Sequence, residues 1–506
     1  MKLRSIAIFF LIILLSSTSS WSTTYEVGPG KTHANLNSVP WLSLGPGDSV
    51  RIFYRPEPYR SKIGLRCRGT AQAPIRISGV KGANGELPVI SGENAQTPTA
   101  LQGFFSKQWD EFLGVFVIKK GSGDSWGYKP GYITFENLKI VAGHPSYSYT
   151  DQEGNVGHYS NGAAAIWAVL VENLTIHGCE ITDNGNGLFV LSKSSEEEVS
   201  RNILIENNYI YHNGNVGRDR EHNTYTQAAG IIFQYNKIGT LRAGAMGSTL
   251  KDRSSGTIIR YNWIESSART IDLVGAEDSF AVVTHEPNYQ KTFVYGNVII
   301  NNVDYSKAHG FPYASAMIHY GGDCGVPDVY RNGTLYFYYN TVAITATKTN
   351  VWSMRLFDVT LNTANVSLWN NVIHLQGDSN FSLMNEHGQA FFEGTNWITN
   401  GWLEGRNSSF DGSVTTNGTL LTGSAPGWKD LPNQDFNLTE TSPCLDKALP
   451  LSDVITADHD MTQMYVPPTG VTARTSTGAA MDLGAFEATG DQVKPIAPSN
   501  LSISVD

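Results

Sequence analysis

A short pattern of polar and hydrophobic positions recurs along the chain: an asparagine, one variable residue and then an aliphatic residue. The seven clearest copies are NNYI at Asn208, QYNKI at Asn236, RYNWI at Asn262, YGNVI at Asn297, YYNTV at Asn340, WNNVI at Asn371 and TNWI at Asn396, and two related copies, FENLKI at Asn137 and VENLTI at Asn173, come earlier. The shortest intervals between neighbouring asparagines are 25, 26 and 28 residues. Repeats of this length indicate a solenoid in which each repeat forms one coil.

The pattern predicts an all-β fold, a single-stranded right-handed parallel β-helix of about ten to twelve rungs. Asparagine tolerates the left-handed backbone conformation that a rung corner requires. Its side-chain amide can also bond to the asparagine of the next rung, which would give an Asn ladder along the stack. The aliphatic residue two positions later would point inward and fill the core. The longer intervals after Asn262 and Asn297 indicate insertions on one face.

Composition agrees with this fold and limits the choice of partners. Glycine (50) and tyrosine (23) are abundant, and charged residues make up only 16% of the chain, against about 25% in average proteins. The formal net charge of −10 argues against a general nucleic-acid binder, which carries a basic surface. It does not exclude an anionic polysaccharide, because a local basic site can lie on an acidic protein.

The chain divides into three segments. Residues 1–22 have a basic start (Lys2 and Arg4), an apolar run over 6–15 and a small polar stretch, the pattern of a secretory signal peptide. We therefore expect a secreted protein, and no later segment is apolar for long enough to span a membrane. Residues 23–488 are predicted as the β-helix domain, with 23–100 as an N-terminal cap and first rungs. Residues 489–506 form a tail rich in Pro and Ser.

Cysteine usage leaves the redox state open. The four cysteines, Cys67, Cys179, Cys324 and Cys444, are far apart in sequence, so no pair has the close spacing of a zinc site. Export permits disulfides, but the wide spacing indicates no particular pairing, and buried free thiols are the favoured expectation.

The opening stretch (25–52), the Asn-punctuated rungs and the terminal DLGAFE together resemble secreted right-handed parallel β-helix proteins of the pectin-lyase-like superfamily. The stretches EHNTYTQAAGIIFQYN, LKDRSSGTIIRYNWIE and DLVGAED are similar to a bacterial group often labelled polysaccharide-degrading. This resemblance covers nearly the whole chain after residue 22 and implies the fold. It implies activity only weakly, because fold does not fix function.

Charged side chains concentrate in residues 211–279, about two and a half rungs. Residues one rung apart can lie side by side, since stacked strands are about 4.8 Å apart. Lys251 and Asp272, 21 positions apart, are candidates for such a pair. Strand alternation predicts that Lys251 and Arg253 share one face and that Asp252 points to the other.

These residue types suit cleavage of a uronate-containing polysaccharide by β-elimination. That reaction needs a cation to neutralise the uronate, a base to remove the C5 proton and an acid to protonate the leaving oxygen. The candidate catalytic residues are Lys251, Arg253, His222, Tyr225, Arg269 and Asp272. The candidate substrate-binding residues are Arg242, Glu277, Asp278 and His319, the last from the polar stretch HYGGD that ends at Asp323.

Other interpretations remain open. β-Helix lyases acting on alginate or dermatan carry a Lys-Ser pair and an arginine one rung later, and in that alignment Arg253 and Val274 occupy the two key positions, which removes the expected pair. A hydrolase would instead use two carboxylates among Asp272, Glu277 and Asp278. The same charges could form a structural ion-pair network in a non-catalytic polysaccharide-binding protein. A third possibility is an epimerase or other modifier that leaves the chain length intact. We expect a monomer without a cofactor or metal, because no loop has recognisable calcium-ligand spacing.

Overall fold

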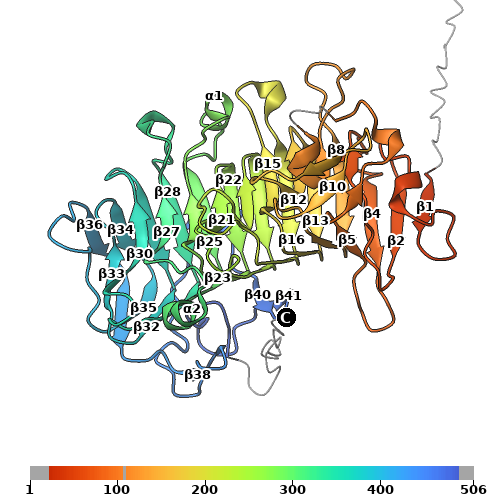
Figure 1. Cartoon of the computed structure of the whole chain (residues 1–506). Coiled ribbons are helices and arrows are strands. Elements are labelled where there is room, and N and C mark those ends of the chain that lie inside the picture. The colour runs from red at the N-terminus through yellow and green to blue at the C-terminus, as the bar shows by residue number, and fades with distance from the viewer. Residues whose placement is uncertain (1–21, 106–109, 489–506) are drawn as a thin grey trace, which may run out of the picture.

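Three stacked parallel sheets form the body of the protein. The computed structural model describes residues 22–105 and 110–488, so almost all of the predicted signal peptide (1–22) and the tail (489–506) lie outside the described residues. Figure 1 shows the strands stacked along one long axis, from β1 at one end to β36 at the other. The predicted right-handed parallel β-helix is confirmed.

Each rung contributes one strand to each sheet over most of the axis. Within the described residues, sheet 1 has 13 strands in the order β1 (Thr24–Val27), β2 (Ser49–Phe53), β4 (Ile75–Val80), β8 (Gly131–Glu136), β13 (Glu172–His177), β16 (Arg201–Glu206), β19 (Ala229–Gln234), β22 (Ser255–Arg260), β25 (Lys291–Tyr295), β28 (Thr334–Tyr338), β31 (Asn365–Trp369), β34 (Gln389–Phe392) and β36 (Ser413–Thr416). Sheet 2 consists of β5 (Val89–Ser91), β9 (Lys139–Val141), β14 (Glu180–Ile181), β17 (Tyr209–Ile210), β20 (Lys237–Ile238), β23 (Trp263–Glu265), β26 (Val298–Asn302), β29 (Thr341–Thr345), β32 (Val372–Gln376), β35 (Thr395–Thr399) and β37 (Thr419–Gly423). Sheet 3 consists of β3 (Ile63–Leu65), β7 (Gly114–Ile118), β12 (Ala164–Val169), β15 (Asn186–Leu191), β18 (Thr224–Thr226), β21 (Ser248–Asp252), β24 (Arg269–Leu273), β27 (Ala316–Tyr320), β30 (Ser353–Val359) and β33 (Asn380–Met384).

Shorter elements lie in the connections. They are β6 (Ala95–Gln96), β10 (Ser148–Thr150), β11 (Val156–His158), the hairpins β38 (Trp428–Asp430) with β39 (Asp435–Leu438) and β40 (Gln463–Val466) with β41 (Gly470–Ala473), the helices α1 (Phe280–Val283), α2 (Val303–His309) and α3 (Asp453–Thr456), and the 3₁₀ turns Leu36–Ser38, Thr99–Leu101, Glu111–Leu113, Glu196–Glu198 and Pro327–Val329. Helix α1 follows the end of β24 and α2 precedes β27. Because the strands are parallel, these two insertions leave sheet 3 at opposite edges.

The predicted Asn ladder is present. From Asn208 to Asn396, the side-chain amide nitrogen of each of the seven asparagines except the last donates to the side-chain oxygen of the next, over 2.9–3.2 Å. All seven side chains are fully buried, and so is each aliphatic residue two positions later. This ladder aligns the rungs at the corner between sheets 1 and 2.

One detail of the corner prediction is wrong. The left-handed residue is not the ladder asparagine but the residue before it, for example Tyr235 (φ 60°), Tyr261 (φ 54°) and Tyr339 (φ 50°). The ladder amide is therefore free to bond along the stack, while its neighbour makes the turn. Aromatic rings of the turning residues pack outside the core under the C-terminal segment.

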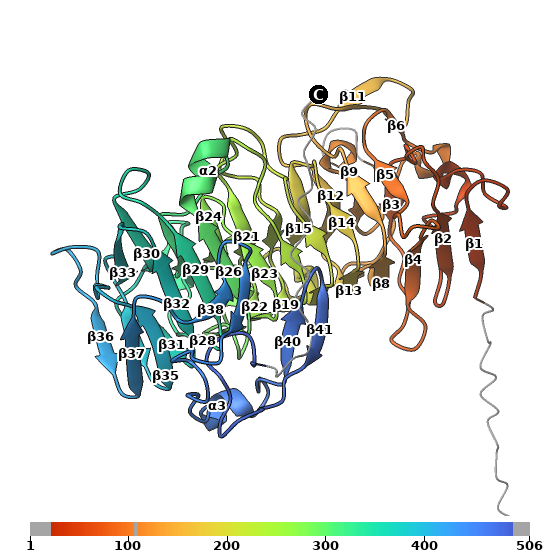
Figure 2. The same cartoon turned by 90° about the horizontal axis from the view of Figure 1, so that it is seen from below.

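The described solenoid strands end at β37, and residues 424–488 fold back along the outside of the middle rungs (Figures 1 and 2). The backbone nitrogen of Ala485 donates to Thr341 Oγ1 (3.0 Å), and the Tyr338 hydroxyl donates to the His459 carbonyl (2.6 Å). The predicted domain reached residue 488, and its last part is this covering segment rather than further rungs. It covers sheets 1 and 2 and leaves the outer face of sheet 3 to the loops around it.

All four cysteines are free thiols. Cys67, Cys179 and Cys444 are buried, and Cys324 is partly exposed. Within the described ranges, no helix combines the length and hydropathy needed to span a lipid bilayer.

Candidate functional site

One row of side chains crosses the outer face of sheet 3, one residue from each successive strand. The parallel register places the following residues beside one another: Trp167, Phe189, Tyr225, Lys251, Asp272, His319 and Asp358. The first three are aromatic and the last four are charged or titratable. The prediction that Lys251 and Asp272 lie side by side is confirmed.

Strand alternation sorts the charges around β21 as predicted. Lys251 and Arg253 face outward, where both contact Asp323. Asp252, between them, points into the solenoid and forms an ion pair with Arg331 (2.8 Å). One tripeptide thus places opposite charges on the two faces of the sheet.

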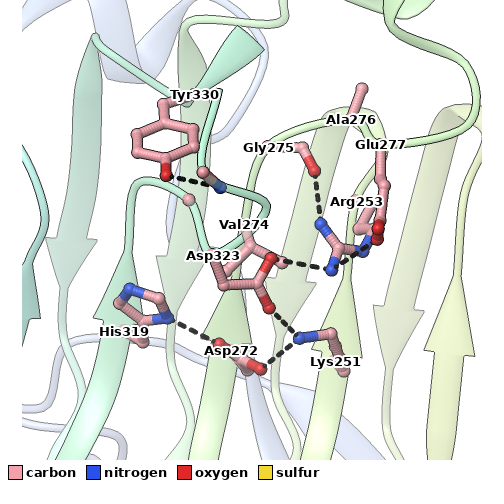
Figure 3. A network of polar contacts seen from close by, with 12 residues as sticks. Lys251, Arg253, Asp272, Val274, Gly275, Ala276, Glu277, His319, Asp323 and Tyr330 are labelled. Atoms are coloured by element: carbon pink, nitrogen blue, oxygen red, sulfur yellow. Dashed lines mark hydrogen bonds and ion pairs between the residues drawn. The ribbon is translucent and has the colours of Figure 1, made fainter. Parts of the chain in front are cut away.

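Asp323 completes the outer cluster. Its Oδ2 accepts a hydrogen bond from Lys251 Nζ (2.6 Å), and its Oδ1 accepts one from Arg253 Nη2 (2.7 Å) (Figure 3). It lies in the loop 321–333 after β27, some 70 residues further along the chain. Asp323 ends the polar HYGGD stretch, but no local spacing ties a loop residue to a strand two rungs away, so the sequence pattern did not indicate Asp323 as a site residue.

Every nitrogen of the Arg253 guanidinium has a partner. Nε donates to the Tyr225 hydroxyl (2.9 Å), Nη1 to the Gly275 carbonyl (2.7 Å), and Nη2 contacts Asp323 and Glu277 Oε2 (3.0 Å). Its side chain is only 5% exposed, against 30% for Asp323 and 49% for Glu277. Arg253 therefore lies beneath Asp323 and Glu277, while Arg269 at 39% is the exposed cation of the network.

Asp272 is held at the centre of the row. It accepts hydrogen bonds from Lys251 Nζ (2.8 Å), Ser248 Oγ (3.2 Å) and Arg269 Nη1 (3.3 Å), and it is 2.8 Å from His319 Nδ1. Asp272 is nearly fully buried. These contacts hold Lys251 and His319 in place, and the catalytic role predicted for Asp272 stays a prediction.

Electrostatics keeps these groups charged. Burial raises the pKa of the Asp272 carboxyl, but Lys251 and His319 outweigh it and hold the pKa well below the usual range. Burial also raises the pKa of Asp323, but the positive charges of Lys251 and Arg253 have the larger effect and lower that pKa overall. Burial lowers the pKa of Lys251, yet the attraction of Asp272 and Asp323 raises it overall. Lys251 is thus a paired ammonium and not a free base.

His222 and Tyr225 border the cluster. His222 is buried two residues before β18, and its Nδ1 accepts a hydrogen bond from the Ser248 backbone nitrogen (2.8 Å). Burial and the nearby Lys251 lower its pKa to about 3, so the ring is neutral. The Tyr225 ring stacks on Phe189 (4.9 Å between centroids), which stacks on Trp167 (3.9 Å). The stacked rings cover one another and form a rigid wall beside Lys251.

Two predicted site residues lie outside the network. Arg242 contacts Asp183 (2.7 Å) and the Gly214 carbonyl at the corner between sheets 2 and 3, away from Lys251, and its substrate-binding role stays a prediction. Asp278 accepts a hydrogen bond from Gln227 Nε2 (2.8 Å), which places it at the margin of the charged network. The remaining predicted residues, Arg269, Glu277 and His319, contact the network directly.

No group of three or more His, Cys, Asp or Glu residues in the described part of the chain is arranged to hold a metal ion. Val274, which occupies the position of the lyase arginine in the alignment with alginate and dermatan lyases, is buried. The space one rung beyond Arg253 therefore holds an aliphatic side chain.

Comparison with known proteins gives no match among family models and none among curated proteins. Solved structures similar in fold include the pectate lyase Pel9A (12% identity, 93% of this chain and 97% of that one, TM-score 0.44) and the lacto-N-biosidase of Eubacterium ramulus (12%, 79% and 68%, 0.46). An alginate lyase from Paenibacillus is also similar (12%, 68% and 92%, 0.37). At this identity the likeness is one of fold alone. By its stacked parallel sheets and Asn ladder, the chain is a right-handed parallel β-helix protein.

Proposed function

We propose that the protein is a secreted carbohydrate-active enzyme that hydrolyses a glycosidic bond of a polysaccharide on the outer face of sheet 3. The observation that carries this proposal is a pair of exposed carboxylates, Asp323 and Glu277, held by one nitrogen of Arg253 at 2.7 and 3.0 Å. The two oxygens are separated by less than the sum of these distances. Glycosidases work with two carboxylates, and retaining enzymes hold them about 5–5.5 Å apart.

The two carboxylates divide the reaction between them. Asp323, kept ionised by Lys251 and Arg253, is the nucleophile that attacks the anomeric carbon. Glu277, in its protonated form, gives its proton to the leaving oxygen as the glycosidic bond breaks and is left as a carboxylate. Glu277 then removes a proton from water, and the resulting attack on the anomeric carbon releases Asp323. This assignment predicts retention of anomeric configuration.

The charges favour hydrolysis over β-elimination. Elimination needs a cation free to neutralise the substrate carboxylate, whereas Lys251 and Arg253 each already contact two carboxylates. An anionic sugar would also meet the exposed, ionised Asp323. We therefore favour a neutral polysaccharide, and the expectation of an anionic one stays a prediction.

A lyase is the second candidate. It is supported by the Tyr225 hydroxyl, which accepts a hydrogen bond from Arg253 and lies one strand from Lys251. A tyrosine in this position can give a proton to a leaving oxygen. In this case a uronate would replace Asp323 and Glu277 on the two cations.

The test compares two products on a panel of neutral and uronate-containing polysaccharides. New reducing ends without ultraviolet absorbance of an unsaturated uronate indicate hydrolysis, and both signals together indicate elimination. Asp323→Asn and Glu277→Gln should each lower the rate by about 100-fold or more. Glu286→Gln is the matched control, because Glu286 lies in the same loop as Glu277 but pairs with Arg201 (2.8 Å).

Full activity of Asp323→Asn would overturn the assignment of the nucleophile. Absorbance of unsaturated product would move the conclusion to the lyase. Retention on a polysaccharide without any new chain ends would leave a binding protein.

A further inference from the structure

Beneath the candidate site, a second charged pair is enclosed in the solenoid. Asp252 is fully buried, and its Oδ1 accepts hydrogen bonds from Thr226 Oγ1 (2.7 Å) and Ser254 Oγ (2.6 Å). Its Oδ2 accepts from Thr257 Oγ1 (2.6 Å) and Arg331 Nη2 (2.8 Å). The Ser254 backbone nitrogen also donates to Oδ2 (3.2 Å), so five donors surround this one buried carboxylate.

Arg331 is equally enclosed and fully bonded. Its Nε donates to the Val274 carbonyl (3.0 Å), Nη1 to Thr292 Oγ1 (3.0 Å) and Nη2 to Asp252. These partners belong to different rungs, so the planar fork of the guanidinium connects the ends of β21 and β24 to β25. Its backbone nitrogen also donates to the Gly321 carbonyl (2.9 Å), which closes the loop 321–333 at its base.

The same loop carries Asp323, and this places the two charged contacts on opposite faces of one strand end. Outside the sheet, Lys251 and Arg253 hold Asp323. Inside, Asp252 holds Arg331. The tripeptide Lys251-Asp252-Arg253 therefore binds the loop on both faces of the sheet. Its two cations pair with Asp323 outside, and its carboxylate pairs with Arg331 inside.

We propose that Arg331 is a positioning residue, whose buried pair with Asp252 fixes the loop so that Asp323 lies over Lys251 and Arg253. This inference rests on the proposed function for its effect on catalysis, but not for its effect on the loop. A buried pair contributes little net stability compared with apolar side chains of similar volume. The pair does, however, raise the free energy of every loop conformation in which Asp252 or Arg331 is buried without its partner.

Removing one partner would leave a lone buried charge and could unfold the protein. The decisive variant therefore removes both charges, as Asp252→Asn together with Arg331→Met. We expect this double variant to fold, with far-ultraviolet circular dichroism like that of the wild type, and to hold the loop less precisely.

Cys324 gives a readout of the loop that does not depend on activity. It follows Asp323 directly and is the one partly exposed cysteine, whereas the other three are buried. We expect its alkylation by iodoacetamide to become about 10-fold faster in the double variant, because a released loop opens more often.

On an active substrate, we expect kcat of the double variant to fall by about 100-fold, the loss associated with a misplaced reacting group, and KM to change little. The charged groups facing Asp323 are Lys251 and Arg253, with the Asp272 and Glu277 carboxylates beyond them. When Asp323 leaves the two cations its pKa rises toward the ordinary value, so the acidic limb of the pH–rate profile should move to higher pH.

The matched control removes another buried pair, Arg474 and Glu487 (3.1 Å, both nearly inaccessible), which lies in the covering segment. Arg474→Met with Glu487→Gln should leave Cys324 alkylation, kcat and the pH profile unchanged. Arg331→Lys keeps the positive charge but loses the planar guanidinium. Its Cys324 alkylation rate and its kcat should lie between those of the wild type and the double variant.

The outcomes separate this inference from the proposed function. A folded double variant with wild-type Cys324 alkylation overturns the positioning role, whatever the enzyme does. Faster alkylation with unchanged kcat and pH profile shows that the pair fixes the loop but that Asp323 is not catalytic, which overturns the proposed function and this residue's part in catalysis.

Discussion

The Asn ladder gives the most direct test of the physical argument for the fold. Asn262 lies in the middle of the ladder and is fully buried. Its Oδ1 accepts from the backbone and side-chain nitrogens of Asn236 (2.9 and 3.0 Å). Its Nδ2 donates to the carbonyls of Phe233 and Arg260 (both 2.9 Å) and to Asn297 Oδ1 (3.0 Å). Asn262→Ala removes all five hydrogen bonds.

The expected cost follows from what each partner keeps. The Asn236 side chain still donates to Ile205, and Asn297 Oδ1 still accepts from the Asn262 backbone. The Asn236 backbone N–H loses its side-chain acceptor inside the protein, which costs about 1–3 kcal/mol. Adding about 0.5–1 kcal/mol for each of the four remaining bonds gives a loss of about 3–7 kcal/mol in the free energy of unfolding.

The assay is reversible urea unfolding followed by circular dichroism, with hydrogen exchange to locate the change. Exchange should increase in the rungs on either side of Asn262, because each repeat contacts mainly its neighbours. Asn417→Ala is the control, since Asn417 is exposed and makes one side-chain bond, to Glu393. It should change stability by no more than about 0.5 kcal/mol. A loss below about 1 kcal/mol for Asn262→Ala would refute the view that the ladder stabilises the stack.

Three further predictions concern titration and thiols. The pKa of His222 is lowered to about 3 in the folded protein, so between the ordinary histidine pKa and pH about 3 the unfolded chain binds more protons than the folded one. The free energy of unfolding should therefore fall as pH falls through this range. His222→Asn should reduce that fall, measured as urea midpoints across the same pH range. Burial lowers the pKa of Lys62 to about 7, so the free energy of unfolding should rise as pH rises from about 7 to the ordinary lysine pKa. Lys62→Met should remove this pH dependence. A thiol reagent should modify only Cys324 rapidly in the folded protein and all four cysteines in denaturant, and fewer than four reactive thiols in denaturant would reveal a disulfide.

Repetition made much of the fold readable from the sequence. Each copy of the Asn pattern repeats the same local choice, so the evidence for a solenoid accumulates over seven rungs. The pairing of Lys251 with Asp272 followed from the rung length, and the outward direction of Lys251 and Arg253 followed from strand alternation. These features depend on near neighbours along the chain or on a fixed interval between repeats.

Other features required the tertiary structure. Asp323 and Arg331 come from an insertion whose path no repeat dictates, yet both bind residues of the tripeptide at the end of β21. Arg242 has the charge expected of a site residue, but its place at another corner turns it toward Asp183. The sequence alone determined the register of the rungs, because hydrophobic stacking and the Asn ladder repeat at every turn. Only the folded chain decided which carboxylates meet which cations, because insertions close over a strand according to packing and not to spacing.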